Sequence, residues 1–200
     1  MAVYKTSNSG LLTRREYTSF LAGNDMFVPF APSGAYDSIA TFTLTSTSTG
    51  VTFTSIPSTY THLQLRTVSI NSTSGNRLIQ VGSSGSVDTG ANYGIHELYG
   101  SGTSATAGSI LSASNIQIFY APPDASAPAA SVTDILDYTN TNKITVTRTL
   151  GGADLNGSGR ITFASGFWNN TAAVNTLKVF PASGNFEAGS RFALYGIKGA

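Results

Sequence analysis

Short stretches of alternating apolar and polar residues fill the chain from about Tyr36 to its end. Turn-forming residues separate these stretches about every 8–12 positions, a spacing typical of all-β proteins. In one stretch Ile161 and Phe163 alternate with Thr162, so that successive side chains fall on opposite faces of a strand. The pattern predicts strands at 38–45, 51–56, 61–70, 77–81, 93–99, 109–120, 130–138, 143–150, 160–167, 175–180 and 191–198.

Runs of glycine, serine and asparagine mark the turns between these strands. Examples are the Ser-Thr-Ser-Gly run before Asn76, the pair Gly151-Gly152, and the run from Asn156 to Gly159. Such residues adopt turn conformations at low cost. Roughly ten antiparallel strands in one domain predict an antiparallel β-sandwich that is jelly-roll-like, with a barrel as the alternative. No repeat of fixed period is visible in the sequence, which disfavours a propeller or a β-helix.

Residues 1–35 depart from this pattern, because they combine charged residues with the proline-containing stretch FVPFAPSGAY. Apolar positions between Leu11 and Leu21 suit one or two turns of an amphipathic helix, with Thr13 as its N-cap. We therefore predict an N-terminal extended arm with a short helix, followed by a sandwich domain at 36–200. The arm is expected to dock on another chain, the alternative being a frayed terminus. Its expected contact residues are Arg14, Arg15, Glu16, Tyr17 and Phe20.

Charged residues are scarce. They make up 10% of the 200 residues, against about 25% in a typical globular protein. A surface of hydroxyl and amide groups costs little to bury, because few long side chains are ordered and few charges lose water. This suits dense packing beside copies of the same chain. The net charge of +1 disfavours nucleic acid as a partner, since phosphate binding draws on clustered Lys and Arg.

The sequence shows no recognisable targeting or membrane segment. Its first residues lack the apolar run of a signal peptide, and no apolar stretch is long enough for a transmembrane helix. We therefore expect a soluble protein made in the cytoplasm, with no membrane partner. The chain has no cysteine, which excludes disulfides, thiolate nucleophiles and cysteine-based zinc sites.

Candidate catalytic residues are few. His62 and His96 are the only histidines, and neither has another histidine at metal-ligand spacing. Asp134 and Asp137 lie three positions apart in a predicted strand, so they point to opposite faces and do not form a pair. Phosphate-binding glycine motifs and a nucleophile elbow are absent from the sequence. We expect no enzymatic activity, no cofactor and no metal.

Two features keep a ligand-binding function open. The segment from Asp154 to Ser158 copies the start of a calcium loop, but Ser165 stands where the bidentate glutamate belongs. A hairpin turn explains the same residues. Four aromatic residues are candidates for stacking on a sugar, the alternative being that Trp168 closes one end of the core. They are Tyr93, Tyr99, Tyr138 and Trp168.

Five segments resemble, as a set, parts of one protein family. They are YDSIAT at 36–41, VTFTSIPSTYTHLQLR at 51–66, NYGIH at 92–96, DILDYTNTNK at 134–143 and FALYGIK at 192–198. The family consists of small structural proteins of tailed-bacteriophage virions, which are labelled as virion, capsid or tail-fibre proteins. The resemblance implies a β-sandwich located on the phage particle, and it brings no catalytic residues with it.

The resemblance and the composition lead to one function hypothesis. We expect a capsid decoration (cement) protein that binds the outer shell of the virion and stabilises it. Its partners would be the major capsid protein and copies of itself, as a homotrimer. The first alternative is a tail-fibre or head-fibre module that binds a host surface glycan. A more distant alternative is a polysaccharide depolymerase, which would need two carboxylates facing one cleft.

Overall fold

The computed structural model of the protein describes residues 35–122, 128–155 and 159–198. The chain divides into two units, Met1–Asp37 and Ser38–Ala200. The helix predicted in the arm lies outside the described residues, and so do the predicted contact residues Arg14, Arg15, Glu16, Tyr17 and Phe20.

Every regular element in the described residues is a β-strand, as the alternating pattern predicts. The strands are β1 (Tyr36–Thr43), β2 (Val51–Phe53), β3 (His62–Ser69), β4 (Gly75–Gly82), β5 (Tyr93–Ser101), β6 (Ser104–Ala113), β7 (Ile116–Ala121), β8 (Ala129–Leu136), β9 (Thr145–Asp154), β10 (Gly159–Trp168), β11 (Thr176–Pro181) and β12 (Arg191–Ile197).

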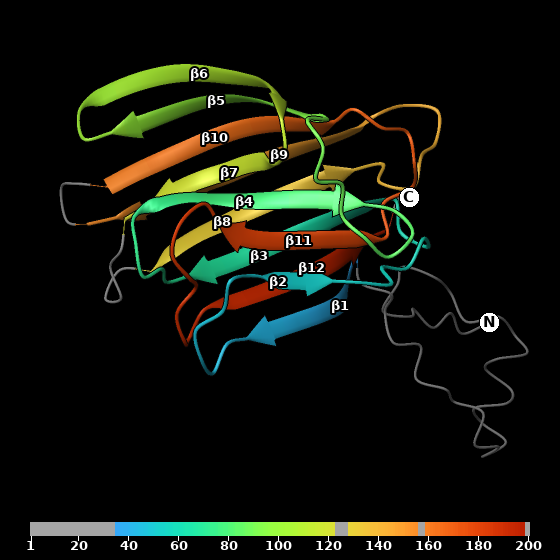
Figure 1. Ribbon diagram of the computed structural model, residues 1–200, viewed down its shortest axis with the longest axis horizontal. Coiled ribbons are helices and arrows are strands. Elements are labelled where there is room, and N and C mark those ends of the chain that lie inside the picture. Colours follow the sequence, from blue (N-terminus) through green and yellow to red (C-terminus); the bar gives the residue numbers. More distant parts are fainter. Residues whose placement is uncertain (1–34, 123–127, 156–158, 199–200) are drawn as a thin grey trace, which may run out of the picture. The chain divides into compact units, whose positions relative to one another are not determined.

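These strands form two antiparallel sheets that pack face to face (Figure 1). The larger sheet has the order β1-β12-β3-β8-β9-β10-β5-β6, and the smaller has the order β2-β11-β4-β7. Without the hairpins β5–β6 and β9–β10, two four-stranded sheets remain, whose chain order is that of an eight-stranded jelly roll. The two hairpins extend the larger sheet beyond β8. The predicted jelly-roll-like β-sandwich is therefore confirmed.

The predicted strand at 109–120 is wrong in detail. The structure divides this range between the end of β6 and most of β7, with a bend at Ser114 and Asn115. Just before the bend, Ser112 has a φ of 56°, in the left-handed region that ends regular strand geometry. The chain thus leaves the larger sheet and enters the smaller one. Apolar residues stand on both sides of the break, Ile110 and Leu111 before it and Ile116 and Ile118 after it, so the sequence pattern does not show where the first strand ends.

The predicted turn at Gly151-Gly152 is also wrong, since both residues lie inside β9. A Cβ atom on Gly151 would stand 2.7 Å from the Cβ of Ser131 and 3.0 Å from the ring of Phe119 on the opposing sheet. These separations leave no room for a side chain. Glycine is therefore present at this position because of close packing and not because the chain turns.

The core lies between the two sheets, and its composition is uneven. The smaller sheet and strands β3 and β12 contribute large apolar side chains, such as Phe119 and Phe192, which are fully buried. The inner face of β9 instead contributes buried threonines. The hydroxyls of Thr133 and Thr149 pair at 2.9 Å across β8 and β9, so their burial leaves these polar groups satisfied. Small inner residues on β8–β10 let the large side chains of β7 approach.

Candidate interaction surface

The outer face of the larger sheet, which points away from the core, carries large apolar side chains. On β10, Ile161 and Phe163 are 60% and 55% exposed, whereas Thr162 and Ala164 are buried. On β9, Leu150 is exposed in the same way. A sheet with one face in water ordinarily points its apolar residues toward the core and its polar residues outward. These strands have the reverse arrangement, which makes their outer face a candidate interaction surface.

Strand register aligns these side chains in two neighbouring rows across the sheet. The first row, in order over β8, β9, β10 and β5, is Val132, Leu150, Phe163 and Leu98. The second row, over β3, β8, β9 and β10, is Val68, Ala130, Gly152 and Ile161. We call the exposed large side chains of both rows the apolar face: Val68, Leu98, Val132, Leu150, Ile161 and Phe163.

The apolar face is comparable in size to the largest apolar patch of a typical monomeric protein. Its six side chains are each about half exposed, and a large side chain offers on the order of 150–200 Å². Together they expose roughly 500 Å² of apolar area. The largest apolar patch on a typical monomer covers about 300–600 Å², and patches of this size often mark interaction sites.

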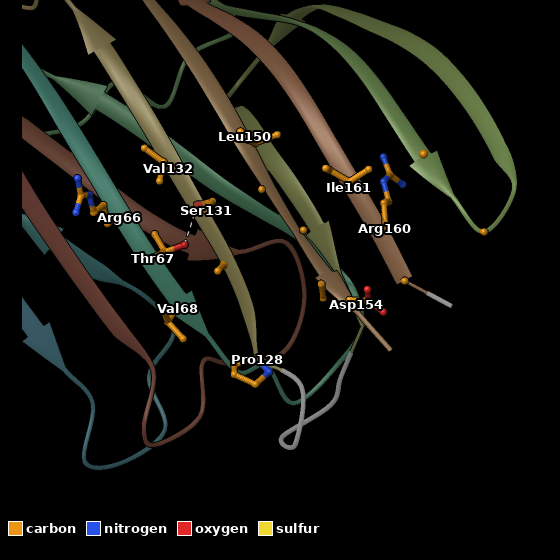
Figure 2. Close-up of a pocket in the computed structure, with 17 residues that line it drawn as sticks. Arg66, Thr67, Val68, Pro128, Ser131, Val132, Leu150, Asp154, Arg160 and Ile161 are labelled. Atoms are coloured by element: carbon orange, nitrogen blue, oxygen red, sulfur yellow. Dashed lines mark hydrogen bonds between the residues drawn. The ribbon is translucent and has the colours of Figure 1, made fainter. Parts of the chain in front are cut away.

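A shallow hollow of about 950 Å³ lies within the apolar face. Figure 2 shows side chains from four neighbouring strands around it: Val68, Val132, Leu150 and Ile161. Small residues such as Ala130 and Gly152 also line it. A Cβ atom on Gly152 would stand 2.1 Å from the backbone oxygen of Arg160, so the approach of β10 requires glycine there. The hollow gives the apolar face a concave part that suits an inserted apolar side chain.

A polar network borders the apolar face on the side of β12. The Nε2 atom of Gln64 donates to Oδ1 of Asp134 at 2.9 Å, and Nε of Arg66 donates to Oε1 of Gln64 at 2.8 Å. The guanidinium of Arg66 also lies 5.2 Å from the ring centroid of Tyr195. These contacts hold a cation in a defined position beside the apolar rows. An apolar centre with a polar rim is the usual anatomy of a protein–protein interface.

The residues considered for catalysis lie apart or serve other contacts. Nδ1 of His62 accepts a hydrogen bond from the backbone N–H of Asp137 at 2.9 Å. Asp137 forms an ion pair with Lys143, whereas Asp134 accepts from Gln64. Within the described ranges there is no group of three or more His, Cys, Asp or Glu side chains that could hold a metal. The calcium-like segment at 154–158 lies partly outside the described residues.

Three of the four aromatic residues considered for sugar stacking are buried. Trp168 belongs to the core, as its packing interpretation predicts, and Tyr93 and Tyr138 are also buried there. Tyr99 is half-buried, and the guanidinium of Arg160 lies 3.5 Å from its ring centroid. A sugar could not stack on the ring face that the guanidinium covers.

Arg160 occupies this position because a chain of polar contacts holds it. Its Nη2 atom lies 3.3 Å from Oε2 of Glu97, which also accepts from Nε2 of Gln117 at 3.0 Å. Asn76 donates to Oε1 of Gln117 at 2.7 Å. The chain links β10 and β5 of the larger sheet to β7 and β4 of the smaller sheet. This cluster is absent from the sequence-based candidates, because its members are far apart in the sequence.

A hydrogen bond between the buried Trp168 and the carboxylate of Asp88 links the stability of the sandwich to pH. The indole Nε1 of Trp168 donates to Oδ2 of Asp88 at 2.8 Å, and Asn92 and the backbone N–H of Gly90 also donate to this carboxylate. The hydrogen bond from Trp168 is the main reason why the pKa of Asp88 lies below its ordinary value. A carboxyl group whose pKa is lower in the folded than in the unfolded state stabilises the fold at any pH above its unfolded-state pKa. This stabilisation is lost as the pH falls through the folded-state pKa.

We therefore expect the Asp88→Asn variant to lose less stability than the wild type when the pH falls from about 5 to about 2. The asparagine amide does not titrate, so the contribution of this site becomes constant with pH. Midpoints of urea unfolding at a series of pH values measure the effect as a difference between the two proteins. Parallel curves for the two proteins over this range would show that Asp88 is not linked to folding.

Comparison of the chain with protein-family models, curated proteins and solved structures gives no match. The part of the chain described by the structure contains no helix that is long and apolar enough to cross a membrane.

Proposed function

We propose that the protein is a structural protein of a bacteriophage virion, a capsid decoration protein that binds the outer shell and stabilises it. The observation that carries the proposal is the apolar face. There the outer side of the larger sheet exposes large apolar side chains, whereas the inner sides of β9 and β10 carry mostly threonine, alanine and glycine. The resemblance of residues 36–198 to virion proteins implies a place on the phage particle, and a shell subunit as the partner is part of the proposal. Jelly rolls occur in viral capsid proteins but also in lectins, so the fold alone does not decide between these functions.

Burial of the apolar face against a shell subunit would supply the binding energy. Roughly 500 Å² of apolar area corresponds to about 12 kcal/mol before the costs of association, at about 25 cal/mol per Å². Those costs are estimated at about 4–15 kcal/mol, so a single contact is weak. Many weak contacts that form only on an assembled shell stabilise that shell by mass action. The predicted arm contact through Arg14, Arg15, Glu16, Tyr17 and Phe20 would add to each site.

The glycan-binding alternative has weaker support. Of the four aromatic residues predicted as candidates for stacking on a sugar, Trp168, Tyr93 and Tyr138 are buried. The guanidinium of Arg160 lies over one ring face of Tyr99. A fibre module that binds a host glycan is therefore the second candidate function. Failure of the shell-binding test would favour it.

The test compares two lysine variants on the same strand and the same face. Phe163→Lys places a charge in the apolar face, whereas Ser165→Lys places the same charge two positions further on, beside the polar residue Arg148. Both side chains are exposed, so both variants are expected to fold. On purified particles of the encoding phage, we expect Phe163→Lys to lower occupancy at least tenfold and Ser165→Lys to leave it near that of the wild type.

Quantitative mass spectrometry of these particles measures the occupancy and also the copy number. We expect a copy number comparable to that of the major capsid protein, and particles without the protein should burst at a lower temperature. Full occupancy with Phe163→Lys would contradict the assigned binding surface. A few copies per particle, with unchanged heat resistance but impaired adsorption to cells, would replace the decoration function with glycan binding.

A further inference from the structure

Strand β6 is a long edge strand that lacks charged residues and proline, and its one irregularity is a register shift beyond Ile110. It covers Ser104–Ala113, ends the larger sheet after β5, and is exposed over most of its length (Figure 1). Its sequence, SATAGSILSA, contains no charged residue and no proline. Ile110 and Leu111 are 48% and 68% exposed. Natural proteins commonly protect such edges with lysine, proline, a bulge or a short strand, because free backbone groups pair with other strands.

The edges of the smaller sheet are protected in these ways. At one edge, β2 has only three residues, Val51–Phe53. At the other edge, β7 is buried along nearly its whole length. Strand β1, at the opposite edge of the larger sheet, carries the charged residue Asp37. In β6 itself, the register with β5 is regular from Ser104 to Ile110 and shifts only beyond this stretch. Among the described strands, β6 is thus the long, uncharged edge.

We propose that β6 pairs antiparallel with β6 of a second copy of this chain, about a twofold axis at Ser109. An edge strand that pairs with itself forms an isologous contact, which closes as a dimer. In an antiparallel pair, residues directly opposite each other share a face of the sheet. In a symmetric pair of identical strands, the twofold axis therefore lies at a residue that stands opposite the same residue of the second copy. Because β6 carries no charge, self-pairing brings no like charges together.

An axis at Ser109 is favoured because it matches large residues with small ones. It sets Ile110 opposite Gly108 of the second copy, and it brings Leu111, which lies at the register shift beyond Ile110, toward Ala107 of the second copy. An axis at Gly108 would instead set glycine against glycine, where no side chains pack. Pairs of opposed side chains are the unit of sheet stabilisation, so the Ser109 register covers the most exposed apolar residues of the strand.

Pairing at β6 would also place two apolar faces on the same side of one continuous sheet. Leu98 on β5 lies opposite Ala107 on β6 in the row that contains Phe163. In the Ser109 register Ala107 lies opposite Leu111 of the second copy, so the equivalent rows of the two copies are offset by four residues. The proposed dimer differs from the homotrimer expected from the sequence. The proposal concerns the purified protein, so it does not depend on attachment to particles.

The absence of cysteine from the chain permits a direct test with single-cysteine variants of the full chain. In Ser109→Cys, the two thiols would face each other across the axis, at a Cα separation of about 4.5–5.5 Å that a disulfide can bridge. In Ala105→Cys, on the same strand, the two cysteines would lie eight residues apart along the pair, or roughly 27 Å. We expect Ser109→Cys to form a covalent dimer at least tenfold faster than Ala105→Cys under mild oxidation.

Native mass spectrometry of the wild type and of Ser109→Lys provides the second measurement. The wild type is expected as a dimer and Ser109→Lys as a folded monomer, since two like charges would face each other. Phe163→Lys is the control and should stay dimeric. Its lower occupancy on particles would then not result from a loss of dimerisation through β6. Equal cross-linking of the two cysteine variants, or a monomeric or trimeric wild type, would overturn the proposal.

Discussion

Replacement of Trp168 by alanine is expected to lower the free energy of unfolding by about 3–5 kcal/mol, the range for large aromatic residues removed from a core. Trp168 is 2% exposed and belongs to the main apolar cluster. Its indole N–H also satisfies Asp88 at 2.8 Å, and the variant loses this hydrogen bond together with the packing. Guanidinium unfolding followed by far-UV circular dichroism measures the change, because the variant has no tryptophan left to report fluorescence.

Phe163→Ala is the matched control for this experiment. Phe163 is an aromatic residue on the same strand as Trp168, but its side chain points outward and is 55% exposed. Its removal opens no internal cavity, so we expect a change of less than about 1 kcal/mol. Comparable losses for both variants would mean that the outer face of β10 is also buried in the isolated protein. This result would contradict the assignment of the two faces.

Gly166→Val is expected to destabilise the protein by about 3 kcal/mol, at the upper end of the cost of overpacking a core. A Cβ atom on Gly166 would stand 2.5 Å from Cγ2 of Ile116 and 2.8 Å from Oγ1 of Thr147. Neither atom is the far end of a flexible side chain, so the two sheets would have to move apart. The midpoint of guanidinium unfolding, with the slope unchanged, reports the loss.

Gly100→Val separates this overpacking from the general effect of valine in a strand. Gly100 lies on β5 of the same sheet, and the nearest atom to its added Cβ would be Cγ2 of Ile161 at 3.4 Å. That distance is an ordinary van der Waals contact. Valine also suits a strand better than glycine does, so we expect unchanged or slightly higher stability. A loss as large as that of Gly166→Val would show that strand conformation, and not the spacing of the sheets, requires glycine at both positions.

Most of the fold follows from the sequence, because strands carry a local signal. The spacing of Ile161 and Phe163 around Thr162 has the period of a strand, and the predicted turn signal that ends at Gly159 falls where β10 begins. Of the strand predictions, the range 109–120 failed, because the break between its halves is a change of sheet and not a change of residue type.

The candidate surface was much less predictable, because alternation shows that two faces differ but not which one is buried. The alternation of Ile161 and Phe163 with Thr162 and Ala164 is visible in the sequence. Only the opposing sheet decides that the threonine side faces the core. The same limit applies to aromatic residues, since the burial of Tyr138 and the contact of Tyr99 with Arg160 join positions that are distant in the chain.

The sequence by itself determined the all-β class, the places of most strands, the low content of charged residues and the absence of cysteine chemistry, since each is a property of neighbouring residues or of composition. The tertiary structure alone decided that Gly151 fits under Phe119, that β6 ends the larger sheet, and that apolar side chains cover its outer face. The physical reason is that these features depend on which strands are neighbours. In a jelly roll those neighbours are mostly remote in the sequence, so no local pattern encodes them.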